Sequence, residues 1–316
     1  MRLSAAAVGL LVAPTAYGWG SLGHITIAYV ATNFVQDETA AYFKELLRND
    51  TIHYMAGVAT WADTAFHTRS RAQARESCGK VSLSPSSGQF TKNFHFIDAK
   101  DAPPTNCHVD FGRDCKKDGC VVSSLDNYTR QLLDSELAAW RRNQAAKFVI
   151  HFAGDISQPL HAENVEQGGN GIRVRWEGAE LNLHHVWDSS IAEKMLGGIH
   201  RKPYPAAHAW AADLTAAIRD GKYSEESKTW TDGMSLDDPI QTSMAWARES
   251  NAHVCDAVLP DGPSAIVGQE LASGMYFARA APVVELQVAR AGYRLARWLD
   301  LIVERVHARG PAENEL

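Results

Sequence analysis

The sequence lacks an excess of positive charge. Its 316 residues include 31 lysines and arginines against 37 aspartates and glutamates, for a formal net charge of -6. A protein that grips nucleic acid through a basic surface shows the opposite balance. If this chain binds phosphate, the positive charge must come from another source, and bound divalent cations could supply it locally.

Long apolar runs, internal repeats and linkers are also absent from the sequence. Beyond the first eighteen residues, no apolar stretch approaches the roughly 20 residues of a membrane-spanning helix. The length and the 45% hydrophobic content allow one large domain or two small ones. Because no linker divides the chain, we expect one domain. We also expect no membrane span and a monomer.

Cysteine is scarce and odd in number. The five cysteines are Cys78, Cys107, Cys115, Cys120 and Cys255. In an exported protein they could form two disulfides and leave one thiol over. Cys115 and Cys120 flank the turn-like segment Lys-Lys-Asp-Gly and could staple it locally.

Residues 1–18 have the features of a secretory signal peptide. Arg2 precedes the apolar run 5–13, and Ala16-Tyr17-Gly18 places small residues at both key positions of a cleavage site. The alternative, a buried N-terminal helix, is disfavoured because the apolar run is short and follows a basic residue directly. We therefore predict secretion of a mature protein that begins at Trp19.

Two potential N-glycosylation sites agree with export. Asn49 and Asn127 each begin an Asn-x-Thr triplet. Such triplets also arise by chance, so they support export without proving it. The expected organisation is a signal peptide, residues 1–18, followed by one secreted domain, residues 19–316.

Apolar residues recur at helical spacing in several segments. The sequence predicts a hairpin over 172–183, where apolar and polar residues alternate around Gly178, and long surface loops over 69–89 and 100–120. Together these patterns predict an all-α, single-domain multi-helix bundle with one short β-hairpin. The expected helices cover residues 24–34, 40–47, 125–140, 145–156 and 284–306.

A histidine and an aspartate four residues apart occur twice, as His151 with Asp155 and His184 with Asp188. On a helix, such a pair shares one face and can chelate a single ion. One pair alone is most often a surface ion pair or a satisfied core histidine. The first pair lies in a nearly apolar segment, where unpaired charge is costly, so two pairs together favour metal binding.

Further histidines and aspartates complete this set. His161 follows the first pair closely, and Asp63 and His95 lie upstream of it. Imidazole and carboxylate without thiolate suit zinc in a water-accessible, catalytic role, although manganese and iron also accept these ligands. The cysteines remain available for disulfides.

A series of short motifs containing these residues occurs in one order along the chain, from Trp19 to about Leu301. It resembles the fungal and plant zinc-dependent nucleases that are specific for single strands. The motifs are Trp19-Gly-Ser-Leu-Gly-His24, Trp61-Ala-Asp63, His95-Phe-Ile-Asp98, Pro103-Pro-Thr-Asn-Cys107, His151-Phe-Ala-Gly-Asp155, Gln158-Pro-Leu-His161, Gly168-Gly-Asn170, Asn182-Leu-His184-His-Val-Trp-Asp188 and Gly292-Tyr-Arg-Leu-Ala.

The resemblance implies the helical fold shared with zinc phospholipase C, with three zinc ions at the bottom of a cleft. It also explains the signal peptide, because only a free α-amine at Trp19 can donate a lone pair to zinc. The implied ligands are the amino nitrogen and carbonyl oxygen of Trp19 with His24 for one ion, Asp63, His95 and His151 for a second, Asp155 between these two, and His161, His184 and Asp188 for the third.

The resemblance further implies hydrolysis of single-stranded DNA and RNA to 5'-phosphorylated products, with 3'-nucleotidase activity. A water between the first two ions loses a proton and attacks phosphorus in line, because zinc lowers the pKa of water. The third ion stabilises the departing 3'-oxygen. Asp63 and Asp155, beside the attacking water, are the expected catalytic residues.

By the same resemblance, Phe96, Asp98 and Asn170 recognise the base. Stacking on an aromatic ring tolerates any sequence and demands a base that is free, which accounts for the preference for single strands. The alternative for Phe96 is packing in the core. The substrates implied are single-stranded nucleic acid and 3'-nucleotides.

One position departs from the family pattern. Relatives tend to carry arginine or lysine three residues after the aspartate of Trp-Ala-Asp, where this chain has Phe66. His67, Arg69 or Arg71 could substitute for that phosphate-holding residue. The departure bears on phosphate affinity and rate more than on the type of reaction.

The resemblance also pairs the cysteines. It implies disulfides between Cys107 and Cys255 and between Cys115 and Cys120. Cys78, in the longer loop after Phe66, then stays free.

Two other functions remain open at this point. A zinc phospholipase C shares the fold and a very similar metal set, and the residues at 96, 98 and 170 distinguish it from a nuclease. A secreted zinc-binding protein without turnover is the second alternative, made plausible by Phe66. Cleavage of single-stranded DNA, with and without a chelator, separates these functions.

Overall fold

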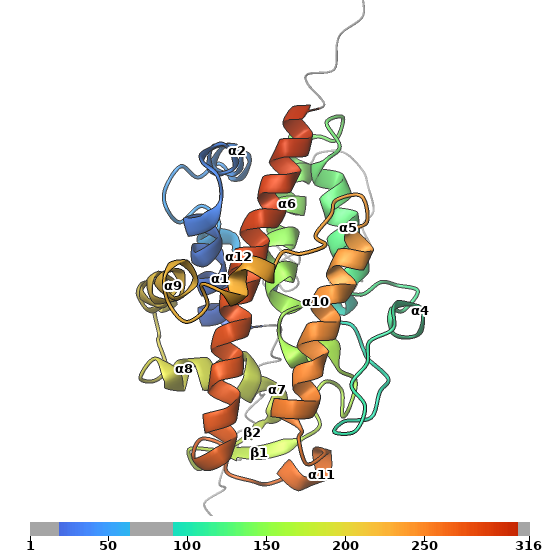
Figure 1. Ribbon diagram of the computed structural model, residues 1–316, viewed down its shortest axis with the longest axis vertical. Coiled ribbons are helices and arrows are strands. Elements are labelled where there is room, and N and C mark those ends of the chain that lie inside the picture. Colours follow the sequence, from blue (N-terminus) through green and yellow to red (C-terminus); the bar gives the residue numbers. More distant parts are fainter. Residues whose placement is uncertain (1–18, 64–90, 309–316) are drawn as a thin grey trace, which may run out of the picture.

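A computed structural model describes residues 19–63 and 91–308 and shows an array of helices along one long axis (Figure 1). The helix α12, Gly274–Ala308, has 35 residues and extends for about 50 Å at 1.5 Å per residue. It packs against α1, Ser21–Phe34, and α6, Ala139–Asp155, while α9, Pro203–Arg219, covers α1 from another side. The signal-peptide prediction for residues 1–18 lies outside the described residues.

Shorter helices surround this centre. The α-helices are α2 Asp37–Leu47, α4 Phe111–Asp114, α5 Val121–Leu132, α7 Leu183–His185, α8 Ile191–Met195, α10 Pro239–His253 and α11 Pro263–Ile266. The short 3-10 helices are η1 Ala56–Val58, η4 Lys92–His95, η5 Pro159–Ala162 and η7 Glu226–Thr229, and the π-helical segments are η6 Val186–Ser190 and η8 Val254–Val258.

The only sheet within the described residues is a hairpin of β1, Arg173–Trp176, and β2, Ala179–Asn182. The strands are antiparallel, and the turn residues Glu177 and Gly178 both have positive φ angles, of 50° and 82°. Such a two-residue turn matches the twist of the strands that it joins. The predicted all-α fold with one short hairpin is confirmed.

The prediction of a continuous helix over 125–140 is wrong, because α5 ends at Leu132 and α6 begins at Ala139. Asp134 stops the first helix: its carboxylate accepts the backbone N–H of Glu136 at 3.0 Å, which favours a turn over a helix. The long helices α9 and α10 were not predicted. Both begin with proline at the first position, and α9 is rich in alanine, which gives little apolar periodicity.

The centre of the core is α1, where every residue from Leu22 to Ala31 is buried. This burial includes His24, a polar side chain that needs partners inside the protein. Among the described residues, no helix combines the length and the apolar content needed to cross a membrane.

The predicted loop 100–120 is largely irregular, with α4 as its one α-helix. Disulfides join Cys107 to Cys255 and Cys115 to Cys120, which is the pairing that the resemblance implies. The first disulfide ties the loop to η8. The second closes a small loop between α4 and α5.

Candidate functional site

The buried carboxylate of Asp155, at the end of α6, is surrounded by histidines from three elements. His24 Nε2 of α1 lies 3.2 Å from Oδ1, while His95 Nδ1 of η4 and His151 Nε2 of α6 lie 2.9 Å and 3.1 Å from Oδ2. His151 and Asp155 are four residues apart, so the helix itself places them on one face. Asp155 is 0% exposed.

Asp63 extends this group. Its Oδ1 lies 3.3 Å from His151 Nε2 and 3.8 Å from His95 Nδ1. The rings of His24 and His151 stack with centroids 4.0 Å apart. A Cβ atom at Gly154 would lie 2.8 Å from His24 Nδ1, so glycine allows α1 to approach α6 this closely.

A second group lies beside the first. His184 Nε2 is 3.4 Å from Asp188 Oδ2, and His161 Nε2 is 3.9 Å from Asp188 Oδ1. His161 Nδ1 also lies 4.0 Å from Asp155 Oδ1, which joins the two groups. The histidines and aspartates that the sequence singled out between His24 and Asp188 therefore converge into one cluster, which we call the His/Asp cluster: His24, Asp63, His95, His151, Asp155, His161, His184 and Asp188.

Backbone carbonyls orient three of the histidines. In each ring the Nδ1–H donates to a carbonyl oxygen, which leaves Nε2 directed at the carboxylates. This arrangement is the usual support for a histidine that ligates a metal. The pairs are His151 with Ala59 at 2.7 Å, His161 with His95 at 2.6 Å and His184 with Gly168 at 2.6 Å.

In the first group, the carboxylates favour the protonated form of His151. Burial acts to lower the pKa of His151, but the carboxylates of Asp155 and Asp63 outweigh it and raise that pKa well above its usual range. Burial acts to raise the pKa of Asp155, yet His151 holds it well below its usual range. A divalent cation would replace this proton.

Burial sets the protonation of the second group. It raises the pKa of Asp188 well above its usual range, and with the neighbouring His161 it lowers the pKa of His184 to about 3. Burial therefore favours the uncharged forms of both the carboxyl group and the imidazoles. Such a group gains free energy if a cation turns its lone pairs into ligands.

The polar atoms of the cluster fit a metal. Asp188 Oδ2 is buried without a hydrogen-bond partner among the described residues, and the buried atoms His24 Nε2 and Asp155 Oδ1 face each other at 3.2 Å. Buried polar atoms are otherwise nearly always paired. Imidazole nitrogens with carboxylate oxygens are ligands that zinc prefers. Ligand atoms within 4.8 Å of one another occur in three sets, His24 with Asp63 and His151, His95 with His151 and Asp155, and His161 with His184 and Asp188.

Trp19 lies next to this cluster. Its side chain is buried, and Nε1 donates to Ser157 Oγ at 2.8 Å, just beyond the end of α6. The following residue, Gly20, donates its backbone N–H to the carbonyl oxygen of Asp188 at 2.8 Å. The start of the predicted mature chain is thereby fixed between the two groups.

The cluster opens into a cleft of about 480 Å³, which we call the substrate cleft. Phe96, Asp98 and Asn170 all line it, and each is partly exposed. Phe96 directly follows η4, which carries His95, so Phe96 and a residue of the cluster belong to one short segment. The cluster contributes His95, His161 and His184 to the same walls.

Two residues of the site were not predicted. Gln158 Nε2 donates to Asp188 Oδ1 at 2.6 Å, and its only signal in the sequence is its place in the Gln158-Pro-Leu-His161 motif. Lys116 lines the substrate cleft and pairs with Asp98. The only sign in the sequence is its position inside the Cys115–Cys120 loop. Its contact with Asp98 could not be predicted, because the two residues are far apart in the chain.

Other predicted positions lie away from the cluster or outside the described residues. Asn127 is exposed on α5, and Asn49, just after α2, accepts the hydroxyl of Thr51 at 2.8 Å. Glycosylation at both stays a prediction. The predictions for Phe66, His67, Arg69, Arg71 and Cys78, and for the loop over 69–89, lie outside the described residues.

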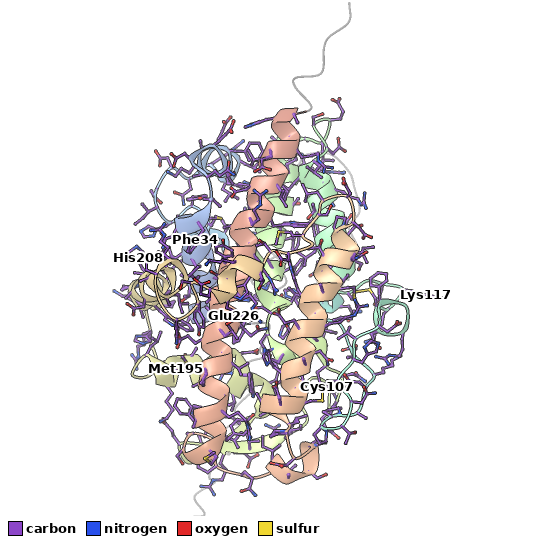
Figure 2. The ribbon with its side chains drawn as sticks, viewed as in Figure 1. Phe34, Cys107, Lys117, Met195, His208 and Glu226 are labelled. Carbon is purple, nitrogen blue, oxygen red and sulfur yellow. A yellow bond between two sulfur atoms is a disulfide. The ribbon has the colours of Figure 1, made fainter. Side chains whose placement is uncertain are left out.

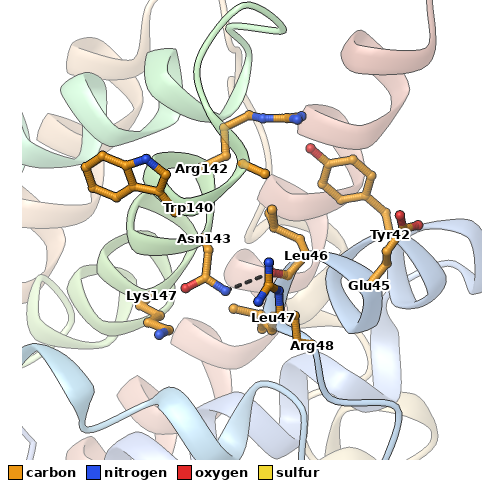
Figure 3. Close-up of a pocket in the computed structure, with 10 residues that line it drawn as sticks. Tyr42, Glu45, Leu46, Leu47, Arg48, Trp140, Arg142, Asn143 and Lys147 are labelled. Carbon is orange, nitrogen blue, oxygen red and sulfur yellow. Dashed lines mark hydrogen bonds between the residues drawn. The ribbon is translucent and has the colours of Figure 1, made fainter. Parts of the chain in front are cut away.

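A separate hollow of about 600 Å³ lies between α2 and α6, at the opposite end of α6 from Asp155 (Figure 3). Trp140, Arg142 and Lys147 line it, and Asn143 Nδ2 donates to the carbonyl oxygen of Leu46 at 2.7 Å. No histidine or aspartate lines this hollow among the described residues. The chemistry therefore belongs to the substrate cleft.

Comparisons with known proteins agree with this site. The family model described as S1/P1 Nuclease matches residues 19–304. Nuclease S1 of Aspergillus oryzae is 44% identical over 96% of this chain and 98% of its own length. Nuclease P1 of Penicillium citrinum is 38% identical over 90% of this chain and 97% of its own length, and Endonuclease 4 of Arabidopsis thaliana is 30% identical over 90% and 89%. The chain therefore belongs to the S1/P1 nuclease family and is a metal-dependent nuclease.

Proposed function

We propose that this protein is a secreted, zinc-dependent endonuclease that hydrolyses single-stranded DNA and RNA. Its products carry 5'-phosphates, and it also removes the phosphate of 3'-nucleotides. The observation that carries the proposal is a buried His/Asp cluster opening into a cleft whose wall holds Phe96. The family match and the relatives named as nucleases support the reaction type.

The proposed cofactor is three zinc ions held by the His/Asp cluster. Asp63, His95 and His151 would hold one ion, His161, His184 and Asp188 another, and Trp19 with His24 the remaining one. Asp155 would lie between the ion of Trp19 and His24 and the ion of Asp63, His95 and His151. Its Oδ1 faces His24 at 3.2 Å and its Oδ2 faces His95 at 2.9 Å, which supports this role. When bound, zinc neutralises phosphate charge and lowers the pKa of water, so that attack on phosphorus proceeds near neutral pH.

The chain's own residues position the reacting parts. Asp63 and Asp155 both face Nε2 of His151, and their carboxylates would stand beside the attacking water. Gln158 orients Asp188 through one carboxylate oxygen and leaves the other free of hydrogen bonds among the described residues. These contacts fix the cluster before substrate arrives, which lowers the cost of reaching the reactive geometry.

Phe96, Asp98 and Asn170 would receive an unpaired base. The ring of Phe96 offers a stacking face at the cleft wall, and the polar side chains beside it offer hydrogen bonds. A base inside a duplex is covered by its neighbours and cannot stack on such a ring, so a single strand is the preferred substrate. The same reasoning admits both DNA and RNA.

Secretion forms part of the proposal because Trp19 needs a free amino group. In the full-length chain its nitrogen belongs to the peptide bond with Gly18 and has no lone pair to donate. The buried, fixed position of Trp19 and the start of the family match at residue 19 support cleavage there. We further propose a monomer, with glycans at Asn49 and Asn127.

The test is cleavage of single-stranded and duplex DNA by purified mature protein, before and after dialysis against a chelator. We expect release of 5'-phosphorylated products from the single strand only, lost with the metal and restored by zinc. Absence of chelator-sensitive cleavage would establish a zinc-binding protein without turnover. Hydrolysis of a phosphocholine ester in place of DNA would establish a phospholipase.

A further inference from the structure

A small disulfide-closed loop reaches the substrate cleft. Cys115 and Cys120 are bonded, and the N–H of Gly119 donates to the carbonyl oxygen of Lys116 at 3.0 Å, which closes a tight turn. Gly119 has a φ of +106°, a conformation that other residues rarely adopt. The turn therefore fixes the backbone of Lys116.

The same loop is attached to the segment that carries His95. The side chain of Asn93 is hydrogen-bonded to Asp118, and a Cβ atom at Gly119 would lie 2.9 Å from the ring of Phe94. Asn93 and Phe94 both belong to η4, which ends directly before Phe96. The loop is thus held in place against one wall of the cleft.

Lys116 extends from this loop over the proposed base-binding residues. Its ammonium group pairs with the carboxylate of Asp98 and lies 6.0 Å from the centroid of the Phe96 ring. Lys116 is 50% exposed and Asp98 13% exposed. An ion pair this exposed contributes little stability. Its position next to both the stacking ring and the polar group that would read the base gives it a different use.

The pair places opposite hydrogen-bonding capacities side by side. A carboxylate only accepts hydrogen bonds, and an ammonium group only donates them. Guanine, uracil and thymine carry a ring N–H next to a keto oxygen on the edge that Asp98 and Lys116 would read. Adenine and cytosine carry a ring nitrogen acceptor next to an amino group, so the order of donor and acceptor is reversed.

We propose that Lys116 is a specificity-determining residue: it donates to the keto oxygen while Asp98 accepts from the neighbouring ring N–H. The site thereby favours guanine, uracil and thymine over adenine and cytosine. The inference rests on the proposed function, because the phosphate held at the His/Asp cluster fixes which way the base enters. An adenine in that orientation would turn its ring nitrogen lone pair toward the Asp98 carboxylate.

The first test compares Lys116→Met with the wild type on the four 3'-mononucleotides. We expect KM for the guanine and uracil nucleotides to rise about tenfold, the size of effect of one charge-assisted hydrogen bond at a partly exposed site. KM for the adenine and cytosine nucleotides should change less than about twofold, and kcat should stay nearly constant for all four. Lys116→Arg, which still donates, should keep the wild-type preference.

Lys117→Met is the matched control, because Lys117 belongs to the same loop but lies at the outer edge of the molecule (Figure 2). It removes the same charge and should leave every KM unchanged. An equal rise in KM for all four nucleotides in Lys116→Met would overturn the proposal and assign Lys116 to phosphate. Unchanged KM values would also overturn the proposal and show that the Lys116–Asp98 pair is only a surface contact.

A binding measurement separates this inference from the reaction itself. Calorimetric titration uses 3'-phosphonate analogues of the four nucleotides, in which a carbon–phosphorus bond replaces the bond that is cleaved, so no turnover occurs. The wild type should bind the guanine and uracil forms about tenfold more tightly than Lys116→Met does. Selective binding without hydrolysis of 3'-nucleotides would contradict the proposed reaction and keep the base selection. Hydrolysis with no difference between bases would contradict the base selection alone.

Discussion

The His/Asp cluster and the mouth of the substrate cleft differ in how their residues are held. In the cluster, Asp155 is fully buried and helices supply or adjoin most of the ligands. At the mouth, Asp98 and Lys116 are partly exposed and stand on irregular segments, one of them closed by a disulfide. From this difference we expect the rigid core to determine the reaction and the short loops to determine the substrate.

The physical cause is the cost of burying polar groups. A buried carboxylate or imidazole must have partners, so a change at one member of the cluster affects all of them. Exposed groups at the mouth exchange protein contacts for water at little cost. Substitutions should therefore abolish turnover in the cluster but only shift affinity at the mouth.

The largest effect is expected for Asp155→Asn. The amide cannot offset the charge of the surrounding ligands, so we expect loss of bound zinc and a fall in kcat of about 10³-fold or more. Metal content per chain and cleavage of single-stranded DNA measure this. Asp213→Asn, at an exposed position on α9, is the control and should behave as wild type. Full metal content with normal cleavage in Asp155→Asn would show that the His/Asp cluster takes no part in the reaction.

An extra residue in front of Trp19 tests the border of the cluster. The added peptide bond removes the amino lone pair, while the buried ring can keep its contact with Ser157. We expect a lower zinc content and loss of most activity, with an unchanged far-UV spectrum. Mass spectrometry of the metal-loaded protein measures the zinc, and equal content in both forms would disprove the role of the amino group.

Phe96→Ala should have a smaller effect, confined to binding. Loss of stacking costs about 1–3 kcal/mol per base, so KM for single-stranded DNA should rise about tenfold or more with kcat largely kept. The matched control is Trp140→Ala, which removes an aromatic side chain that is 59% exposed beside the other hollow (Figure 3). If the control raises KM as much as Phe96→Ala does, the strand binds elsewhere.

The smallest effect on activity is expected in the helical scaffold. Glu249 of α10 accepts from Arg294 at 2.8 Å and 2.9 Å and pairs with Arg290 at 2.7 Å. Glu249→Gln should lower the free energy of unfolding by about 2 kcal/mol, less than for a fully buried pair because Glu249 is 31% exposed. Metal content and kcat should not change.

The pH dependence of stability should follow from the same group. Burial acts to raise the pKa of Glu249, but Arg294 and Arg290 outweigh it and hold the pKa below its usual value. The ionised form therefore stabilises the fold above the unfolded pKa of about 4.5, and this contribution is lost as the pH falls through the lower folded pKa. Thermal unfolding between pH 6 and pH 3 should show a smaller acid loss in Glu249→Gln than in the wild type.

Local patterns predicted much of the fold and failed at identifiable places. The apolar run before Asp155 marked a buried helix, and alternation around Gly178 marked the hairpin. The break at Asp134 went unnoticed because apolar residues continue on both sides of it. Helix α9 was not predicted because it is rich in alanine, and small residues bury a helix face without giving a strong apolar pattern.

The sequence by itself determined which groups can do chemistry. The spacing of His151 with Asp155 and of His184 with Asp188 fixes each pair on one helical face, since that geometry is local. Only the tertiary structure decided that His24 stacks on His151, that Gln158 holds Asp188, and that Lys116 lies over Phe96. Such contacts join residues far apart in the chain, and packing of the helices and closure of the Cys115–Cys120 loop set them, which no local pattern encodes.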